Sequence, residues 1–194
     1  MRTVSLRSVV IAAAVVVGST AMVACTTTKP DTTSAQNSNS TTLGTRVSST
    51  LQRLYETAPG SKEMVQRARG VLVFPSVIGG SFVVGVEHGR GELLIGNRVR
   101  GEYTTTAASI GWQAGGQSKA VIYVFNTQEA LDKFLKSDGW AVGADATVAA
   151  GKIGANGSVD STSFDAPVSS YVLTNAGLEA GVALGGSKIT RVTK

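Results

Sequence analysis

The stretch formed by residues 70–96 constrains the fold more than any other part of the sequence. It contains three short apolar runs, rich in β-branched or aromatic residues, over 71–74, 82–86 and 93–95. Glycine, proline or polar residues bound each run, which is typical of short strands joined by tight turns. Residues 88–91 predict one such turn, because their two glycines can adopt positive φ. The stretch predicts β structure, and its chemistry points to no reaction.

The first 24 residues predict an export signal. Two arginines precede an unbroken apolar run over residues 9–17, and small residues then lead to Cys25. This order is typical of a secretory signal peptide, and the run is shorter than the ~20 residues that a membrane-spanning helix needs. Ala24 followed by the only cysteine resembles the cleavage box of bacterial lipoproteins. We expect residues 1–24 to be removed and Cys25 to carry the lipid; the alternative is ordinary cleavage that leaves a free thiol.

The mature chain is expected to consist of a tether and one domain. Residues 25–42 begin with the cysteine that is expected to be lipidated and continue mainly with threonine, serine and asparagine. Such a segment buries too little apolar surface to offset the entropy lost on ordering, so we expect a flexible tether. Residues 43–194 have the size of one domain. Removing residues 1–24 takes two of the 18 Lys and Arg, leaving 16 against 13 Asp and Glu, a net charge of +3. This mild charge permits anionic partners, and no clustered basic face argues for nucleic acid.

Two helices are expected before the first strand. The first covers residues 43–57, and a proline and a glycine end it. Ser61 is expected to cap a second helix over residues 62–68. The first helix carries four apolar residues at helical spacing, which form one stripe: Val47, Leu51, Leu54 and Tyr55.

Basic residues lie off this stripe and along the second helix: Arg46, Arg53, Lys62, Arg67 and Arg69. An amphipathic helix with a basic polar side can lie at a membrane surface. The alternative is that the stripe packs on the sheet while the arginines are solvated.

The second half of the sequence predicts more strands and one helix between them. Residues 119–125 are almost continuously apolar, which indicates a strand buried on both faces. Thr127 is expected to cap a helix over 128–136, and residues 163–167 are expected to be irregular or weakly extended. Further strands are expected over 168–174, 178–184 and 189–192. The fold class is therefore α+β: many short antiparallel strands form a barrel-like or two-layer β core, with N-terminal helices and one helix between strands.

No arrangement of residues in the sequence predicts catalysis. With one histidine, His88, and one cysteine, the chain has no common zinc pattern, and nothing nominates partners for a histidine-based triad. The two glycines of residues 89–91 lack the third glycine of a dinucleotide fingerprint, since Leu94 occupies its position. We expect no enzyme activity, no metal and no cofactor, and we interpret His88 as a solvent-facing turn residue.

Several segments in order resemble a known family. They read RGVLVFP over residues 69–75, GGSFVVG over 79–85, GRG over 89–91, SSY over 169–171 and NAGLEAGV over 175–182. Together they resemble the SYLF domain, also called the Ysc84 actin-binding domain, over residues 45–192. The resemblance implies lipid binding, because eukaryotic members bind phosphoinositides with an amphipathic helix at the N-terminus of the domain. Fungal members of the family also bind and bundle actin, and bacterial members are mostly exported proteins or lipoproteins. The resemblance therefore also makes a protein partner conceivable for this chain.

The expected function is thus that of a non-enzymatic lipoprotein whose domain contacts anionic or phosphoinositide-like headgroups. By the resemblance, the helix over 43–57 makes this contact through Arg46 and Arg53. We expect Lys62, Arg67 and Arg69 to contact the headgroups as well. Thr26 follows Cys25 where aspartate would retain a lipoprotein at the inner membrane, so we expect an anchor in the bacterial outer membrane. The domain would then face the periplasm or the cell surface. Two alternatives stay open: a module that binds a protein of the envelope, and an internal pocket for an acyl chain.

Overall fold

The computed structural model describes residues 32–80, 84–110, 117–145, 148–151, 158–160, 162–179 and 186–193. Residues 32–194 form one compact unit. The predicted export signal, Cys25 and the first part of the tether lie outside the described residues. The division of the chain into signal, tether and domain therefore stays a prediction.

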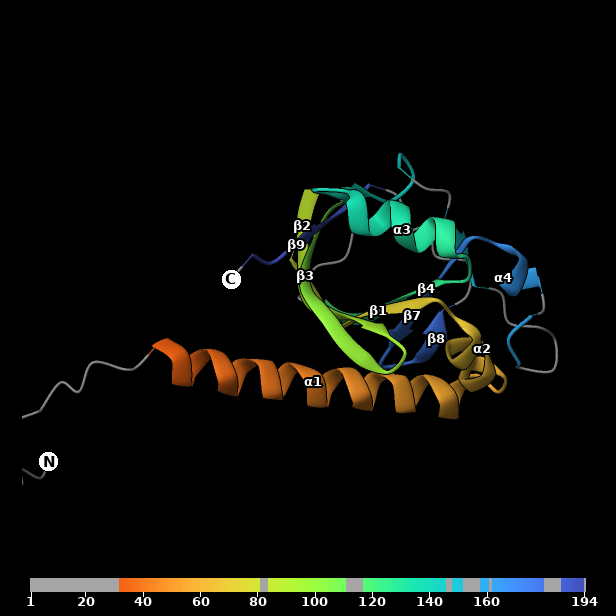
Figure 1. The fold of residues 1–194 in the computed structure, drawn as a ribbon, viewed down its shortest axis with the longest axis horizontal. Helices are drawn as coiled ribbons and strands as arrows, with labels where there is room; N and C mark the ends of the chain where they lie inside the picture. Colours follow the sequence, from red (N-terminus) through yellow and green to blue (C-terminus); the bar gives the residue numbers. More distant parts are fainter. Residues whose placement is uncertain are drawn as a thin grey trace, which may run out of the picture. The chain divides into compact units, whose positions relative to one another are not determined.

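The described strands form one sheet that curls into a half-barrel (Figure 1). The strands are β1 (Gly70–Gly80), β2 (Val84–Ile95), β3 (Arg98–Ile110), β4 (Gln117–Phe125), β5 (Trp140–Ala141), β6 (Val148–Ala150), β7 (Val168–Thr174), β8 (Gly177–Glu179) and β9 (Ser187–Arg191). Their order is β5-β9-β3-β2-β1-β4-β7-β6, with β8 paired to β7. Neighbouring strands are antiparallel except β6 and β7, which are parallel.

Helices cover both faces of this sheet. Figure 1 shows α3 (Gln128–Lys136) across the hollow of the half-barrel, while α1 (Thr32–Thr57) runs along its outer face beside α2 (Ser61–Arg67). A short fourth helix, α4 (Thr162–Asp165), precedes β7. The α+β class predicted from the sequence, with N-terminal helices and one helix between strands, is confirmed.

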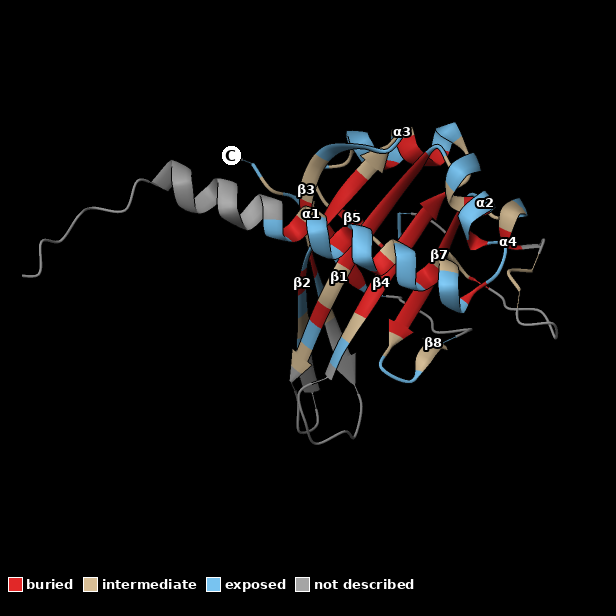
Figure 2. Cartoon of the chain, turned by 90° about the horizontal axis from the view of Figure 1, so that it is seen from below, coloured by how far each residue is buried: buried red, intermediate tan, exposed pale blue. Residues whose placement is uncertain are grey.

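Each face of the sheet buries its own core. The inner core, under α3, is rich in aromatic residues: Phe74, Tyr103, Tyr123, Phe125, Phe134 and Trp140. The outer core, under α1 and α2, is mostly aliphatic and includes Leu54, Met64, Val73, Ile122 and Leu173. Strand β4 contributes to both, with Tyr123 in the inner core and Ile122 in the outer core. The predicted burial of this strand on both faces is confirmed, and Figure 2 shows it buried where α1 crosses it.

The turn predicted at residues 88–91 is wrong, because these residues lie inside the long strand β2. A Cβ on Gly89 would lie 2.9 Å from the carbonyl oxygen of Ser76, and one on Gly91 would collide with the carbonyl of Val73. Both contacts fall where β1 has a register irregularity between Val73 and Ser76. The glycines therefore serve close approach of two backbones rather than a reversal of the chain.

The real reversal after β2 is a two-residue hairpin turn at residues 96–97. Gly96 has φ 56° and Asn97 has φ 60°, and β3 starts at the next residue. Two successive positive φ values are what the favoured two-residue hairpin turns require. As a result, the three short strands expected over residues 71–95 are two long ones.

The helices differ from the expectation mainly at their ends. Helix α1 begins at Thr32 instead of residue 43, in a stretch that holds no proline or glycine. Gly60, with φ 87°, stands at the N-cap of α2, while Ser61 is its first residue and its hydroxyl donates to the Leu54 carbonyl at 3.2 Å. For α3 the predicted bounds and the Thr127 cap are confirmed, since the Thr127 hydroxyl accepts from the Ala130 N–H at 3.2 Å.

Candidate binding surface along α1

The apolar face of α1 packs against the outer face of the sheet. Of the four residues predicted to form the apolar stripe, Val47 and Leu54 are buried in the outer core. Leu51 and Tyr55 are half-buried at its edge. The stripe thus packs on the sheet, the second of the two interpretations left open by the sequence. Because the sheet covers this face, α1 contacts other molecules through its polar side.

The basic residues predicted to contact headgroups are all exposed. Among the described residues, none forms an ion pair with Arg46, Lys62, Arg67 or Arg69. Arg53 differs, because its Nη2 donates a hydrogen bond to the Thr174 carbonyl oxygen at 2.9 Å and so links α1 to the end of β7. Most of the charge on these residues is therefore available to an outside partner.

The basic residues do not form a single cluster. Arg46 and Arg53 are seven residues apart and lie on the same side of α1, about 10 Å from each other along the helix axis. Lys62 and Arg67 project about 140° apart around α2, since they are five residues apart. Arg69 follows α2 just before β1, where its backbone N–H donates to the Phe125 carbonyl oxygen at 2.8 Å. The roles assigned to the five residues stay predictions.

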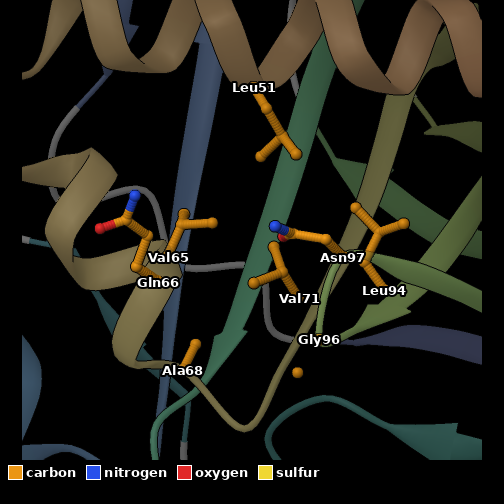
Figure 3. A pocket seen from close by; sticks show the side chains of 9 residues that line it. Leu51, Val65, Gln66, Ala68, Val71, Leu94, Gly96 and Asn97 are labelled. Carbon is orange, nitrogen blue, oxygen red and sulfur yellow. The ribbon is translucent and has the colours of Figure 1, made fainter.

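A small pocket lies between α1, α2 and the turn after β2 (Figure 3). Its volume is about 250 Å³, and its walls are mainly aliphatic: Leu51, Val65, Ala68, Val71 and Leu94. Figure 3 shows the amides of Gln66 and Asn97 beside these side chains. Pockets that enclose a whole small molecule usually measure about 300–1,000 Å³. We call this space the helix pocket; its size and lining suit a short aliphatic group.

A second hollow, the outer groove, opens where α1 crosses the other ends of β1 and β2. It is lined by Thr42, Leu43, Arg46, Ser76, Ile78, His88, Gly89 and Arg90, and its volume is about 330 Å³. Arg90 forms an ion pair with Glu102, with 2.9 Å between Nη2 and Oε2. The hydroxyls of Ser76 and Ser118 are hydrogen-bonded at 2.9 Å. The groove therefore combines basic groups with hydroxyls that can bind an anion.

A buried carboxyl lies beneath α1 next to the outer groove. Glu92 is only 3% exposed, and its Oε2 has no hydrogen-bond partner among the described residues. Gly44 of α1 lies above it, so close that a Cβ there would be 3.7 Å from Oε2. Burial raises the pKa of Glu92, and the neighbouring Glu102 carboxylate raises it further. Helix α1 thus covers an acidic group that is more costly to ionise than an ordinary glutamate.

The outer groove contains residues that sequence reasoning did not select. His88, interpreted as a turn residue, is exposed in β2 on the same face as Arg90 and Glu92. The signal was an alternation of residue types, because His88, Arg90 and Glu92 alternate with two glycines. Reading the glycines between them as turn residues concealed this pattern.

The described part of the chain gives no support for metal chemistry or for a spanning helix. No group of three or more His, Cys, Asp and Glu side chains gathers there in a way that could hold a metal ion. Of the helices in these residues, none combines the length and the apolar character that crossing a membrane requires.

Comparison with known proteins assigns the C-terminal part of the chain. A family model described as Ysc84, the Las17-binding protein actin regulator, matches residues 106–194. This part of the chain is similar to the Ysc84 family. The Ysc84 match begins near the end of β3 and includes β4, α3, β7 and β9, so it confirms the resemblance over this part of the domain. A search of the curated proteins found no match.

The Ysc84 match leaves the basic surface unassigned. All five predicted headgroup residues and the β2 residues of the outer groove precede residue 106. The family is described as a Las17-binding actin regulator, which indicates a binding module. Whether this chain binds a membrane or a protein must be argued from its own surface.

Proposed function

We propose that this protein is a non-enzymatic binding module that contacts anionic lipid headgroups at a membrane surface. The observation that carries the proposal is the orientation of α1. Its apolar face is buried in the outer core, and its arginines are exposed. The cations of α2 are exposed too, and no described residue forms an ion pair with them. Residues 46–69 hold five basic residues against Glu56 and Glu63. A folded domain with such a surface is attracted to anionic lipid without inserting a helix.

The anchor and the location complete the proposal. A lipid on Cys25 would hold the protein to the bacterial outer membrane, while the basic residues orient the domain on the lipid surface. One acyl chain alone binds a membrane reversibly, whereas a second signal makes the attachment stable. The basic surface would supply orientation more than retention.

The direct test is co-sedimentation of the protein with vesicles. Residues 32–194 contain both cores and would be used to remove the effect of the anchor, after circular dichroism and melting have shown that they fold. We expect binding to anionic vesicles and not to neutral ones. Binding should fall as salt rises from low to physiological concentration, because exposed charges are screened over a Debye length of about 8–10 Å.

Variants identify the residues. Replacing the four unpaired cations with glutamine (Arg46→Gln, Lys62→Gln, Arg67→Gln, Arg69→Gln) should abolish most of the binding, since each basic residue near an anionic surface contributes about 1 kcal/mol. The matched control is Lys133→Gln with Lys136→Gln on α3, across the sheet from α1. Equal loss in the control, or none in the fourfold variant, would remove these sites from the proposal.

A protein partner is the second candidate function. It is favoured by the family name, which describes a Las17-binding actin regulator, and by the position of the match over residues 106–194. If vesicles of every composition fail to bind the domain while filamentous actin or an envelope protein co-sediments with it, this candidate replaces the first.

A further inference from the structure

Beyond α1, the outer face of the sheet carries basic and hydroxyl side chains in two adjacent rows. Paired residues of antiparallel strands point to the same face of a sheet. The strand pairing therefore identifies the side chains that form each row. The first row runs across five strands through Ser118, Ile78, His88, Thr106 and Lys188. The second row holds Ser76, Arg90, Thr104 and Thr190. Five of these nine residues carry hydroxyls and three carry basic groups.

The outer groove lies where these rows meet α1. Arg46 of the helix lines the groove opposite His88 and Arg90, and its guanidinium has no partner among the described residues. The sheet forms the other wall, where Ser76 presents its hydroxyl. The groove therefore offers separate donors to a single anion from two sides, which a flat basic surface does not.

The charges around His88 favour an anion on balance. On its own strand it has Arg90, whose charge is offset by Glu102 on β3. Across β3 it has Lys188 on β9, and from α1 it has Arg46. The facing positions on β1 and β3 are the uncharged Ile78 and Thr106. Glu92 also lies on this face of β2, but its raised pKa makes its negative charge more costly to form. Among the described residues, neither Arg46 nor Lys188 has an ion-pair partner.

We propose that the outer groove binds the phosphate group of a small soluble phosphomonoester, such as a sugar phosphate. Arg46 and Arg90 hold the phosphate oxygens by charge-assisted hydrogen bonds, and an N–H group of the His88 ring adds a third donor. The hydroxyl of Ser76, which lines the groove, faces the polyol part of the ligand. This site differs from the lipid contact proposed above, with which it shares only Arg46.

Because His88 is the only histidine of the chain, it reports on the groove directly. The full chain would be labelled with ¹³C-histidine, and residues 32–194 would serve as a second sample with the same expected response. Inorganic phosphate and glucose 6-phosphate are expected to shift the His88 ring signals saturably in the millimolar range, whereas glucose is not.

Two variants and two controls test the assignment by calorimetry and by the His88 signal. Arg46→Gln and Lys188→Gln should each weaken the binding of glucose 6-phosphate, the first about tenfold as expected for one lost charge-assisted hydrogen bond. Lys133→Gln should leave the affinity unchanged, and so should Lys62→Gln, which belongs only to the lipid surface.

The results that overturn the inference are specific. His88 signals that stay unchanged in glucose 6-phosphate, or that move equally in glucose, would exclude a phosphate site in the groove. A response only to vesicles that contain phosphatidic acid would assign the groove to lipid and overturn the soluble ligand. Failure of vesicle binding with an intact His88 response would reject the lipid function and leave this site standing.

Discussion

At the scale of single residues, Glu92 is the side chain whose surroundings most oppose its ordinary charge. It is buried beneath Gly44 with one oxygen unpartnered, and the nearby Glu102 adds like charge. Both causes raise its pKa in the folded protein above that of an unfolded chain. The folded state therefore favours the protonated carboxyl. The stabilising contribution of protonated Glu92 is fully present below about pH 4.3, the ordinary pKa of a glutamate side chain. It is lost as the pH rises through the higher pKa that Glu92 has in the folded protein.

The variant Glu92→Gln isolates this effect. At pH 7 we expect the variant to be more stable than the natural protein by about 1 kcal/mol, because no buried carboxylate has to be ionised. At pH 4 the two proteins should have nearly equal free energies of unfolding. Urea titrations at both pH values measure the difference, and a variant that is less stable at pH 7 would show that the carboxylate has a stabilising partner.

Glycines at two sites should respond in opposite directions to the same substitution. Gly91→Ala should destabilise the protein by several kcal/mol, since its methyl group would collide with the Val73 carbonyl and the Phe74 ring. Gly44→Ala should stabilise it by up to about 1 kcal/mol, because the helix gains alanine and the nearest atom is at 3.7 Å. Chemical denaturation of both variants checks the pair, and equal effects would contradict the proposed role of the glycines.

At the scale of elements, α1 is a structural helix whose inner side holds the outer core and whose outer side is free. Leu54 lies at the centre of that packing, while Leu135 is a leucine of α3 that stays 41% exposed. Helix α1 has only a modest apolar stripe, yet it is fixed on the sheet because residues such as Leu54 are buried there. Tertiary packing rather than intrinsic helix propensity therefore holds it.

Truncating these two leucines measures the difference. Leu54→Ala should lower the free energy of unfolding by about 2–5 kcal/mol, the usual cost of a cavity in a core. Leu135→Ala should change it by no more than about 0.5 kcal/mol. Thermal or urea unfolding provides the comparison, and a small effect at Leu54 would mean that α1 is not fixed on the sheet.

The elements that the sequence predicted well are those whose signals are local. Strand β4 is a continuous apolar run, and α3 has a threonine cap followed by an apolar face, so neighbouring residues suffice to identify each. Strand β2 could not be recognised in this way, because Gly89 and Gly91 are required by β1, which lies beside it only after folding. The two hollows were missed for the same reason. The exposed cations were predictable one by one, but Arg46 and His88 line one groove only because α1 packs on the sheet.

At the scale of the whole molecule, the half-barrel depends on a strand contributed by the end of the chain. Strand β9 pairs with β3, and its Ile189 lies in the inner core. The Thr104 and Thr190 hydroxyls are hydrogen-bonded at 3.0 Å across this pair. Strand β9 also carries β5, so Trp140 is positioned through it.

Deleting residues 187–194 should therefore abolish cooperative unfolding. The deletion removes Ile189 from the inner core and exposes the edge of β3, which favours association of chains. Calorimetry and size-exclusion chromatography would show a broad transition and larger species. Deleting only residues 193–194, which follow β9, should leave both measurements close to those of the full chain. A shortened protein without β9 that melts as sharply would refute the closing role of this strand.

The pairing of β9 with β3 also sets the timing of folding during synthesis. Tyr103 and its partner Arg191 are 88 residues apart, as 191 minus 103 gives. At the usual rate of about 5–20 residues per second, roughly 4–18 s separate the emergence of the two strands from the ribosome. Until then β3 has an open edge and the inner core lacks its last member. A chain carrying the export signal predicted at residues 1–24 would leave the ribosome with its sheet unclosed, in the state in which a polypeptide can still be threaded through a membrane.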